Sequence, residues 1–198
     1  MLMTWELWIK QNILSGKKRF KDSLGDDFPD WQNVKLKNIL NCETSKHELY
    51  DVDKENEGKY PIFNRGKLYK KVSYYDMEVD YIALSIAGNP GECWLYPKGT
   101  SINSTCAYLY LKDSVDANLR YIFANVMYLN FDKYIQGTTI KGLRWKDIKR
   151  ETIPLPCVDE QNRIGDFIGT FALYSQLMGR ELELWKTMKK ALMQKMFI

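Results

Sequence analysis

Two acidic motifs, Pro29-Asp30 and Glu57-Gly58-Lys59, are the clearest candidates for catalytic chemistry in this sequence. In a metal-dependent nuclease, such carboxylates bind magnesium and the lysine assists an attacking water. Here the second motif follows an acidic, loop-like stretch, and Glu-x-Lys arises readily by chance in a chain with 27% charged residues. A nuclease is therefore kept as a minor alternative, to be tested by incubating plasmid with magnesium.

Other catalytic chemistry lacks its essential residues. The one histidine, His47, could act as a base, but the sequence has no Gly-x-Ser-x-Gly elbow to supply a serine nucleophile for it. No glycine-rich phosphate loop is present. Asn89-Pro90-Gly91 lacks the second proline and the aromatic residue of the adenine-methyltransferase element that holds a flipped base. We therefore predict a non-catalytic protein with no catalytic residue and no cofactor.

The cysteines provide neither a metal site nor a disulfide framework. They are widely scattered, contain no Cys-x-x-Cys pair and have a single histidine to join them. The four are Cys42, Cys93, Cys106 and Cys157. No stretch approaches the roughly 20 apolar residues of a membrane span, and the N-terminus does not read as a secretory signal. We predict no bound metal and a reducing, cytoplasmic location.

Positive charge is concentrated in the middle of the chain. Residues 59–150 contain fourteen Lys and Arg against eight Asp and Glu, whereas the remainder contains fifteen against seventeen. A basic centre suits a polyanion such as DNA, although an ordinary solvated surface explains the same excess.

The elements that would position these residues are mostly strands. Short β-type runs occupy residues 60–63, 81–86, 92–96 and 105–111, separated by turns rich in glycine and proline. One helix is predicted over residues 118–131. The fold class is therefore α+β, with a strand-rich domain over residues 31–156, preceded at 1–30 by a short helical segment and a polar linker.

Residues 157–198 are predicted to form one long helix. Apolar residues recur there with alternating steps of four and three, the pattern of a helix that pairs with another helix. A helix of 39 residues is about 58 Å long, too long to bury its apolar stripe on a small domain. A helix folded back on its own core is the alternative. The seam consists of Ile164, Ile168, Phe171, Met178, Leu182, Trp185, Leu192 and Met196.

Several segments, in this order, resemble the target-recognition domain of type I restriction–modification specificity subunits. No single segment is decisive, but their order is specific, and together they cover residues 31–198. They are Tyr60-Pro61-Ile62-Phe63-Asn64-Arg65-Gly66, the strand and turn from Tyr81 to Gly91, Ile102-Asn103-Ser104-Thr105-Cys106, Gly137-Thr138-Thr139-Ile140-Lys141-Gly142-Leu143, the segment from Ile148 to Pro156, and Glu160-Gln161-Asn162-Arg163-Ile164 leading into the long helix.

The resemblance implies a DNA-reading subunit without catalytic activity of its own. Family members carry two such domains, each followed by a helix; the helices pack antiparallel and space the domains along a split target. The methylase subunit and, through it, the translocase/nuclease subunit supply the chemistry. This chain has one domain and one helix. Gln11, Ile13 and Leu14 faintly match Gln194, Met196 and Phe197, as if the chain began within the tail of a preceding helix.

The resemblance also suggests where DNA is contacted. Polar and basic side chains on the loops of the strand-rich domain are expected to read base edges or hold phosphates. A solvated surface role is the alternative for each of them. The first group is Asn64, Arg65, Lys67, Lys70 and Lys71; the second is Ser101, Asn103 and Ser104; the third is Lys133, Gln136, Thr138, Thr139, Lys141 and Arg144.

The helix seam predicts a homodimer, or pairing with another half-subunit, through an antiparallel coiled coil. The main alternative is a coiled-coil adaptor whose globular domain binds protein instead of DNA. A silent cassette that serves only as a recombination donor would have the same sequence features.

Overall fold

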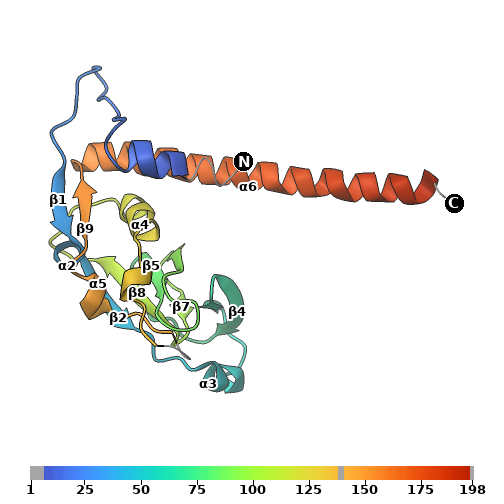
Figure 1. Cartoon of the computed structure of the whole chain (residues 1–198). Helices are drawn as coiled ribbons and strands as arrows, with labels where there is room; N and C mark the ends of the chain where they lie inside the picture. Colours follow the sequence, from blue (N-terminus) through green and yellow to red (C-terminus); the bar gives the residue numbers. More distant parts are fainter. Residues whose placement is uncertain (1–6, 138–140, 197–198) are drawn as a thin grey trace.

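The computed structural model describes residues 7–137 and 141–196 of the chain. Its central element is a four-stranded antiparallel sheet in the order β2-β8-β5-β6, below one end of a long helix (Figure 1). The predicted runs at residues 81–86, 92–96 and 105–111 supply three of these strands, so these predictions are confirmed. The strands are β2 (Leu40–Thr44), β8 (Cys106–Leu111), β5 (Tyr81–Ser85) and β6 (Cys93–Tyr96).

Both faces of β5 are covered, and this explains its continuous apolar sequence. Ile82 and Leu84 point into the main hydrophobic core. Tyr81 and Ala83, on the opposite face, belong to a second core that includes Tyr108. Successive side chains of a strand point to opposite faces, so one short strand joins two packed layers.

Two smaller sheets complete the domain. β1 (Gln32–Lys35) pairs antiparallel with β9 (Thr152–Leu155), which brings the two ends of the strand-rich region together. β3 (Tyr60–Asn64) pairs antiparallel with β4 (Lys67–Val72) and parallel with β7 (Ser101–Ile102). The predicted run at residues 60–63 is therefore a strand.

The predicted helix at residues 118–131 is shorter in the structure. α4 (Leu119–Met127) begins after Asn118, whose side chain accepts a hydrogen bond from the Tyr121 backbone N at 3.1 Å. The chain then continues into the 3₁₀ turn η2 (Asp132–Tyr134). Three short helices were not predicted: α2 (Leu36–Ile39), α3 (Leu49–Lys54) and α5 (Trp145–Ile148).

α6 (Val158–Met196) follows β9 after a two-residue connection and extends well beyond the domain (Figure 1). Its first turns are packed against the domain: Ile164 is buried, and the Gly165 backbone approaches α4 so closely that a Cβ would lie 2.9 Å from the Asn118 side-chain oxygen. Farther along, Met178 and Trp185 are exposed. Pairing of α6 with another helix stays a prediction.

The N-terminal segment also packs at the base of α6. The π-helical turn η1 (Ile9–Ile13) buries Ile9 and Ile13 in the main core, and Gly16, at φ +73°, ends the segment. In Figure 1 this segment runs in the opposite direction to α6. The following linker is held as well, because the Phe20 ring lies 5.7 Å from the Phe167 ring of α6.

The strand-rich mixed α and β domain agrees with the predicted fold class. The domain limits at residues 30 and 156 remain predictions. In the part of the chain that the structure describes, no helix combines the length and apolar character needed to cross a membrane.

Candidate nucleic-acid interface

The first group of predicted DNA-contacting residues lies on the β3–β4 hairpin. Its two-residue turn, Arg65-Gly66, has φ angles of +49° and +78°, as a type I′ turn requires. A Cβ on Gly66 would lie 2.3 Å from the Trp94 indole nitrogen, so glycine allows the hairpin tip to pack on β6. The Arg65 and Lys67 side chains are exposed, whereas Asn64 is half-buried. The hairpin therefore presents cations at a fixed tip.

Two neighbouring lysines of β4 have different environments. Lys70 donates hydrogen bonds from Nζ to the backbone oxygens of Val52, Asp53 and Glu55, at 3.1, 3.0 and 2.5 Å. It therefore holds the C-terminal end of α3, where unpaired carbonyls need donors. Lys71, on the other face of the strand, is exposed.

Replacing Lys70 with methionine is expected to destabilise the α3 end without a selective loss of DNA affinity. The substitution removes three charge-assisted hydrogen bonds and should cost about 1–2 kcal/mol. Amide hydrogen exchange in residues 49–55 should accelerate. Lys71→Met is the matched control: it removes the same charge and should leave the exchange of α3 unchanged. Equal exchange rates in the two variants would contradict the capping role.

The structure corrects two members of the second group. Ser101 and Asn103 are almost fully buried, at 0% and 1% exposure, and cannot touch a base edge. The Ser101 hydroxyl accepts a hydrogen bond from the Asp76 backbone N at 3.0 Å. The Asn103 amide donates to the Thr105 hydroxyl at 2.9 Å. Both residues tie β7 to its neighbours, and only half-buried Ser104 of this group reaches the surface.

The third group lies in and around a loop whose two ends are joined by backbone hydrogen bonds. Gln136 and Gly142 exchange N–H···O bonds of 2.9 and 2.8 Å and close the loop between them. Lys141 is exposed at this loop, whereas Thr138 and Thr139 lie outside the described residues.

The other cations of the third group are held by carboxylates. Arg144 donates to Asp147 at 2.9 Å and to the Gln136 side-chain oxygen at 2.6 Å. Lys133 donates to Glu151 at 2.8 Å. This hydrogen bond is the largest cause of the raised pKa of Lys133 and of the lowered pKa of Glu151, so both groups stay charged at neutral pH. These side chains form an ordered polar rim around the loop.

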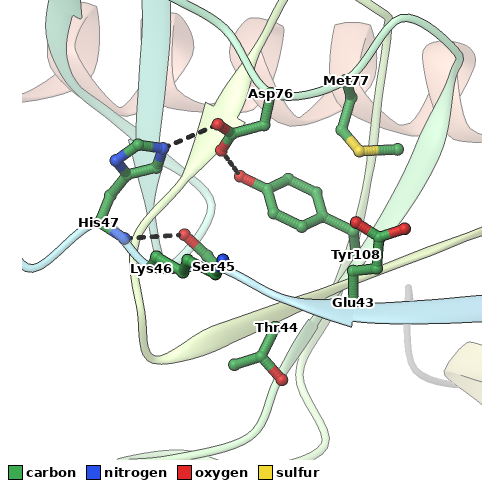
Figure 2. Close-up of a pocket in the computed structure, with 8 residues that line it drawn as sticks. All are labelled: Glu43, Thr44, Ser45, Lys46, His47, Asp76, Met77 and Tyr108. Carbon is green, nitrogen blue, oxygen red and sulfur yellow. Dashed lines mark hydrogen bonds and ion pairs between the residues drawn. The ribbon is translucent and has the colours of Figure 1, made fainter.

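A polar pocket of about 260 Å³ lies where β2, β8 and the segment before β5 meet (Figure 2). His47 Nε2 is 2.8 Å from one oxygen of Asp76, and the Tyr108 hydroxyl donates to the other. The Tyr108 oxygen also accepts a hydrogen bond from the Ile102 backbone N at 3.0 Å. Burial raises the pKa of Tyr108, which therefore stays protonated.

The pocket does not contain an activated nucleophile. The hydroxyl of Ser45, which lines the pocket together with His47, donates to the Ile102 backbone oxygen at 2.5 Å and accepts from the backbone N of His47 itself at 3.3 Å. We interpret the His47 cluster as a structural link among the end of β2, β7, β8 and the segment before β5.

The two acidic motifs considered for a nuclease do not meet. Asp30 lies 3.8 Å from Arg19, at the start of β1 and the base of α6. Glu57 follows α3, at the opposite side of the domain (Figure 1). Their carboxylates therefore do not form one metal site. Within the described residues, no three His, Cys, Asp or Glu side chains are grouped as metal ligands.

The family comparison covers the domain and most of α6. Residues 29–184 match the type I restriction modification DNA specificity domain. The chain belongs to the type I restriction–modification DNA specificity family. The predicted resemblance is thereby confirmed, over a region that begins just before β1.

Relatives within the type I specificity family are about twice as long. The chain is 27% identical over 193 residues to the type I restriction enzyme MjaVIII specificity subunit of Methanocaldococcus jannaschii, covering 91% of this chain and 45% of that subunit. The chain therefore spans less than half the length of this curated relative.

Solved structures show the same fold. The S subunit of a type I restriction-modification system from M. genitalium superposes with a TM-score of 0.64 at 20% identity, covering 84% of this chain and 45% of that one. The HsdS subunit from Thermoanaerobacter tengcongensis gives a TM-score of 0.59 at 20% identity, covering 89% and 46%. The fold of this chain thus corresponds to slightly less than half of each longer chain.

Proposed function

We propose that this chain is the sequence-reading half of a type I specificity subunit, binding one part of a split DNA target without catalysing a reaction. The family match over residues 29–184 carries the proposal. The exposed cations of the β3–β4 hairpin and of the loop closed by Gln136 and Gly142 support it. B-DNA's major groove admits a two-stranded ribbon of the width of such a hairpin.

The chemistry would be supplied by partners. In this proposal, the methylase subunit binds the specificity subunit, and the translocase/nuclease subunit joins through the methylase. The relative from Methanocaldococcus jannaschii is called a restriction enzyme specificity subunit, which supports such an assembly. Because the chain spans 45% of that relative, two copies would supply about the same number of domains and helices.

α6 is the proposed means of joining two halves. Its seam residues Met178 and Trp185 are exposed along the length that leaves the domain. An antiparallel pair of such helices would bury these side chains and place two domains related by a two-fold axis on an inverted-repeat target. Pairing with a different half-subunit would join two unlike domains in the same way.

Arg65→Ala is expected to weaken binding to the preferred sequence by about 1–3 kcal/mol and to relax the choice of base at one position. Arginine at a rigid hairpin tip can form a bidentate contact with guanine, which alanine cannot replace. Selection from a randomised duplex library, followed by titration of the selected duplex, measures both effects. Arg120→Ala, an exposed arginine of α4, is the control of equal charge.

The same selection separates the competing functions. Enrichment of a defined sequence by the unmodified chain supports target recognition. Binding that ignores sequence in the full chain would contradict it. Failure to bind any duplex at low salt, together with capture of a specific protein, would favour the coiled-coil adaptor.

A further inference from the structure

A concentration of positive charge that includes none of the three predicted groups lies on the side of the domain formed by α2 and α5 (Figure 1). It combines residues from three separate parts of the chain. We call it the α2–α5 basic cluster, and it consists of Lys35, Lys37, Lys112, Lys146, Lys149 and Arg150.

Backbone hydrogen bonds hold the three parts together. The Lys37 N–H donates to the Lys149 backbone oxygen at 2.9 Å, which joins α2 to the turn after α5. The Leu36 N–H donates to the Glu151 backbone oxygen, also at 2.9 Å. Lys112, just after β8, donates from Nζ to the Lys37 backbone oxygen at 2.6 Å. The cluster is thus fixed by the fold and does not depend on side-chain conformation alone.

The underlying scaffold is rigid. Leu36, Ile39 and Ile148 lie beneath the cluster and are at most 1% exposed. The side chains of Lys35, Lys37, Lys146 and Arg150 are exposed above them. Long cationic side chains on a packed base can reach a charged partner without reorganising the domain.

Two carboxylates near α5 are already paired. Asp147 is paired with Arg144 at 2.9 Å, and Glu151 is paired with Lys133 at 2.8 Å and accepts a hydrogen bond from the Tyr134 hydroxyl. Among the residues that the structure describes, the five basic residues of the cluster other than Lys112 form no ion pair, and Lys112 bonds only to backbone oxygen.

Uncompensated like charges repel one another and favour a polyanionic partner. Lysine-rich surfaces act on phosphates as flexible point charges and carry no base preference. The cluster also adjoins the third group, because the Lys133–Glu151 and Arg144–Asp147 pairs connect that loop to the α5 region.

We propose that the α2–α5 basic cluster binds the phosphodiester backbone of duplex DNA beside the segment that the loops read. This inference rests on the proposed function, since it assumes that the domain binds a duplex. It assigns to the cluster the sequence-independent part of the affinity, while the hairpin and the loop closed by Gln136 and Gly142 provide base choice.

The test replaces Lys35, Lys149 and Arg150 together with glutamine in the full chain. Binding to the selected duplex and to an unrelated duplex should weaken by the same factor, about tenfold or more at low salt. The slope of log affinity against log salt should fall by about 2–3, because each lost phosphate contact removes about 0.9. The preferred sequence should not change. Lys10, Lys17 and Lys186, replaced together with glutamine, form the control with the same loss of charge.

Each outcome decides between the roles. Binding by the cluster variant equal to that of the control variant would overturn the inference, even while the unmodified chain binds DNA. A loss confined to the selected duplex would also overturn it, because that pattern indicates base reading. No duplex binding by the unmodified chain would instead remove the proposed function itself.

A further variant distinguishes the loss of charge from a loss of correct folding as the cause of weaker binding. Lys35→Arg, Lys149→Arg and Arg150→Lys together keep all three charges and should retain the affinity and salt slope of the unmodified chain. Loss of binding in this charge-preserving variant would show that the cluster acts through packing, and would contradict phosphate binding.

Discussion

Replacing both Met178 and Trp185 with glutamate is expected to convert a dimer into a soluble monomer. The two side chains are 48% and 61% exposed in the single chain, and neither belongs to a packed core, so the substitutions remove little packing within it. In a paired α6, the same side chains would lie in the apolar seam. Met178 is near the middle of Val158–Met196, so an antiparallel pair would bring its two glutamates close together, with the glutamates at position 185 farther out on either side.

The expected cost to pairing is large because burying unpaired carboxylates without partners is strongly unfavourable. Sedimentation over a range of protein concentrations measures the change, with the dimer dissociation constant rising by about a thousandfold or more. Glu181→Gln with Lys186→Gln, two exposed positions of the same helix outside the seam, is the control and should remain dimeric. A dimer unaffected by the seam substitutions would contradict the pairing scheme.

DNA binding should respond in a specific way to the loss of pairing. Two linked domains on an inverted repeat gain affinity from effective concentration, whereas a monomer binds each half-site alone. The seam variant should therefore bind single half-sites as the unmodified chain does, but lose preference for a particular spacing between them. This result would separate reading from spacing, the two roles proposed for the domain and for α6.

The strands that could be predicted from the sequence are those in which buried positions form a run of apolar residues. β5 is apolar up to its last residue, Ser85, because both of its faces are covered, and β8 is likewise apolar and buried in its first four residues. β4 (Lys67–Val72) could not be predicted because its one buried residue is the last, so its sequence has no run of apolar residues. β1 and β9 are short strands that pair with each other although they are far apart in the sequence, so neither has a local pattern that predicts it.

The errors in the candidate site have a common cause. Ser101 and Asn103 are polar residues in a turn-like context, which indicates a surface loop, yet tertiary packing between two sheets buries them. Their hydroxyl and amide groups form hydrogen bonds with neighbouring polar atoms of the protein. The same side-chain types also bind ligands, so residue type alone does not distinguish the two roles. The sequence pattern does not distinguish Lys70 from exposed lysines, because its three carbonyl partners lie at the C-terminal end of α3, a helix that the pattern does not predict.

The α2–α5 basic cluster could not be found along the sequence. Lys37 and Lys149 are more than a hundred residues apart, and a hydrogen bond between their backbones joins them. Charge counting did identify the excess over residues 59–150, but it could not separate paired cations such as Lys133 from free ones. That distinction depends on which carboxylates the fold places beside each cation.

Glu160→Ala is expected to lower the free energy of unfolding by about 3 kcal/mol. Glu160 is fully buried in the first turn of α6 and accepts hydrogen bonds from Arg19 Nε at 3.1 Å and from an Arg19 terminal nitrogen at 2.7 Å. The Trp31 indole N–H donates to the same carboxylate at 2.7 Å. Alanine would leave these donors without their acceptor.

The effect should extend to the position of the domain on its helix. Arg19 also donates to the backbone oxygens of Phe28 and Pro29, so one guanidinium joins both ends of the linker to α6. The hydrogen bond with Glu160 is the largest cause of the raised pKa of Arg19, which keeps the guanidinium charged across the accessible pH range. Without Glu160, the linker is expected to loosen from α6, and amide exchange in residues 17–31 should accelerate.

A double-mutant cycle in urea, at fixed protein concentration, measures the contribution of the pair. Arg19→Ala alone leaves a buried carboxylate with only Trp31 as a donor, so it should also be costly. The double variant should lose clearly less stability than the sum of the two single losses, because neither charge is then left unpaired. Glu181→Ala, an exposed glutamate of the same helix, should cost less than about 0.5 kcal/mol. Additive losses would mean that Arg19 and Glu160 act independently, and would contradict the joint role of the pair in holding the linker on α6.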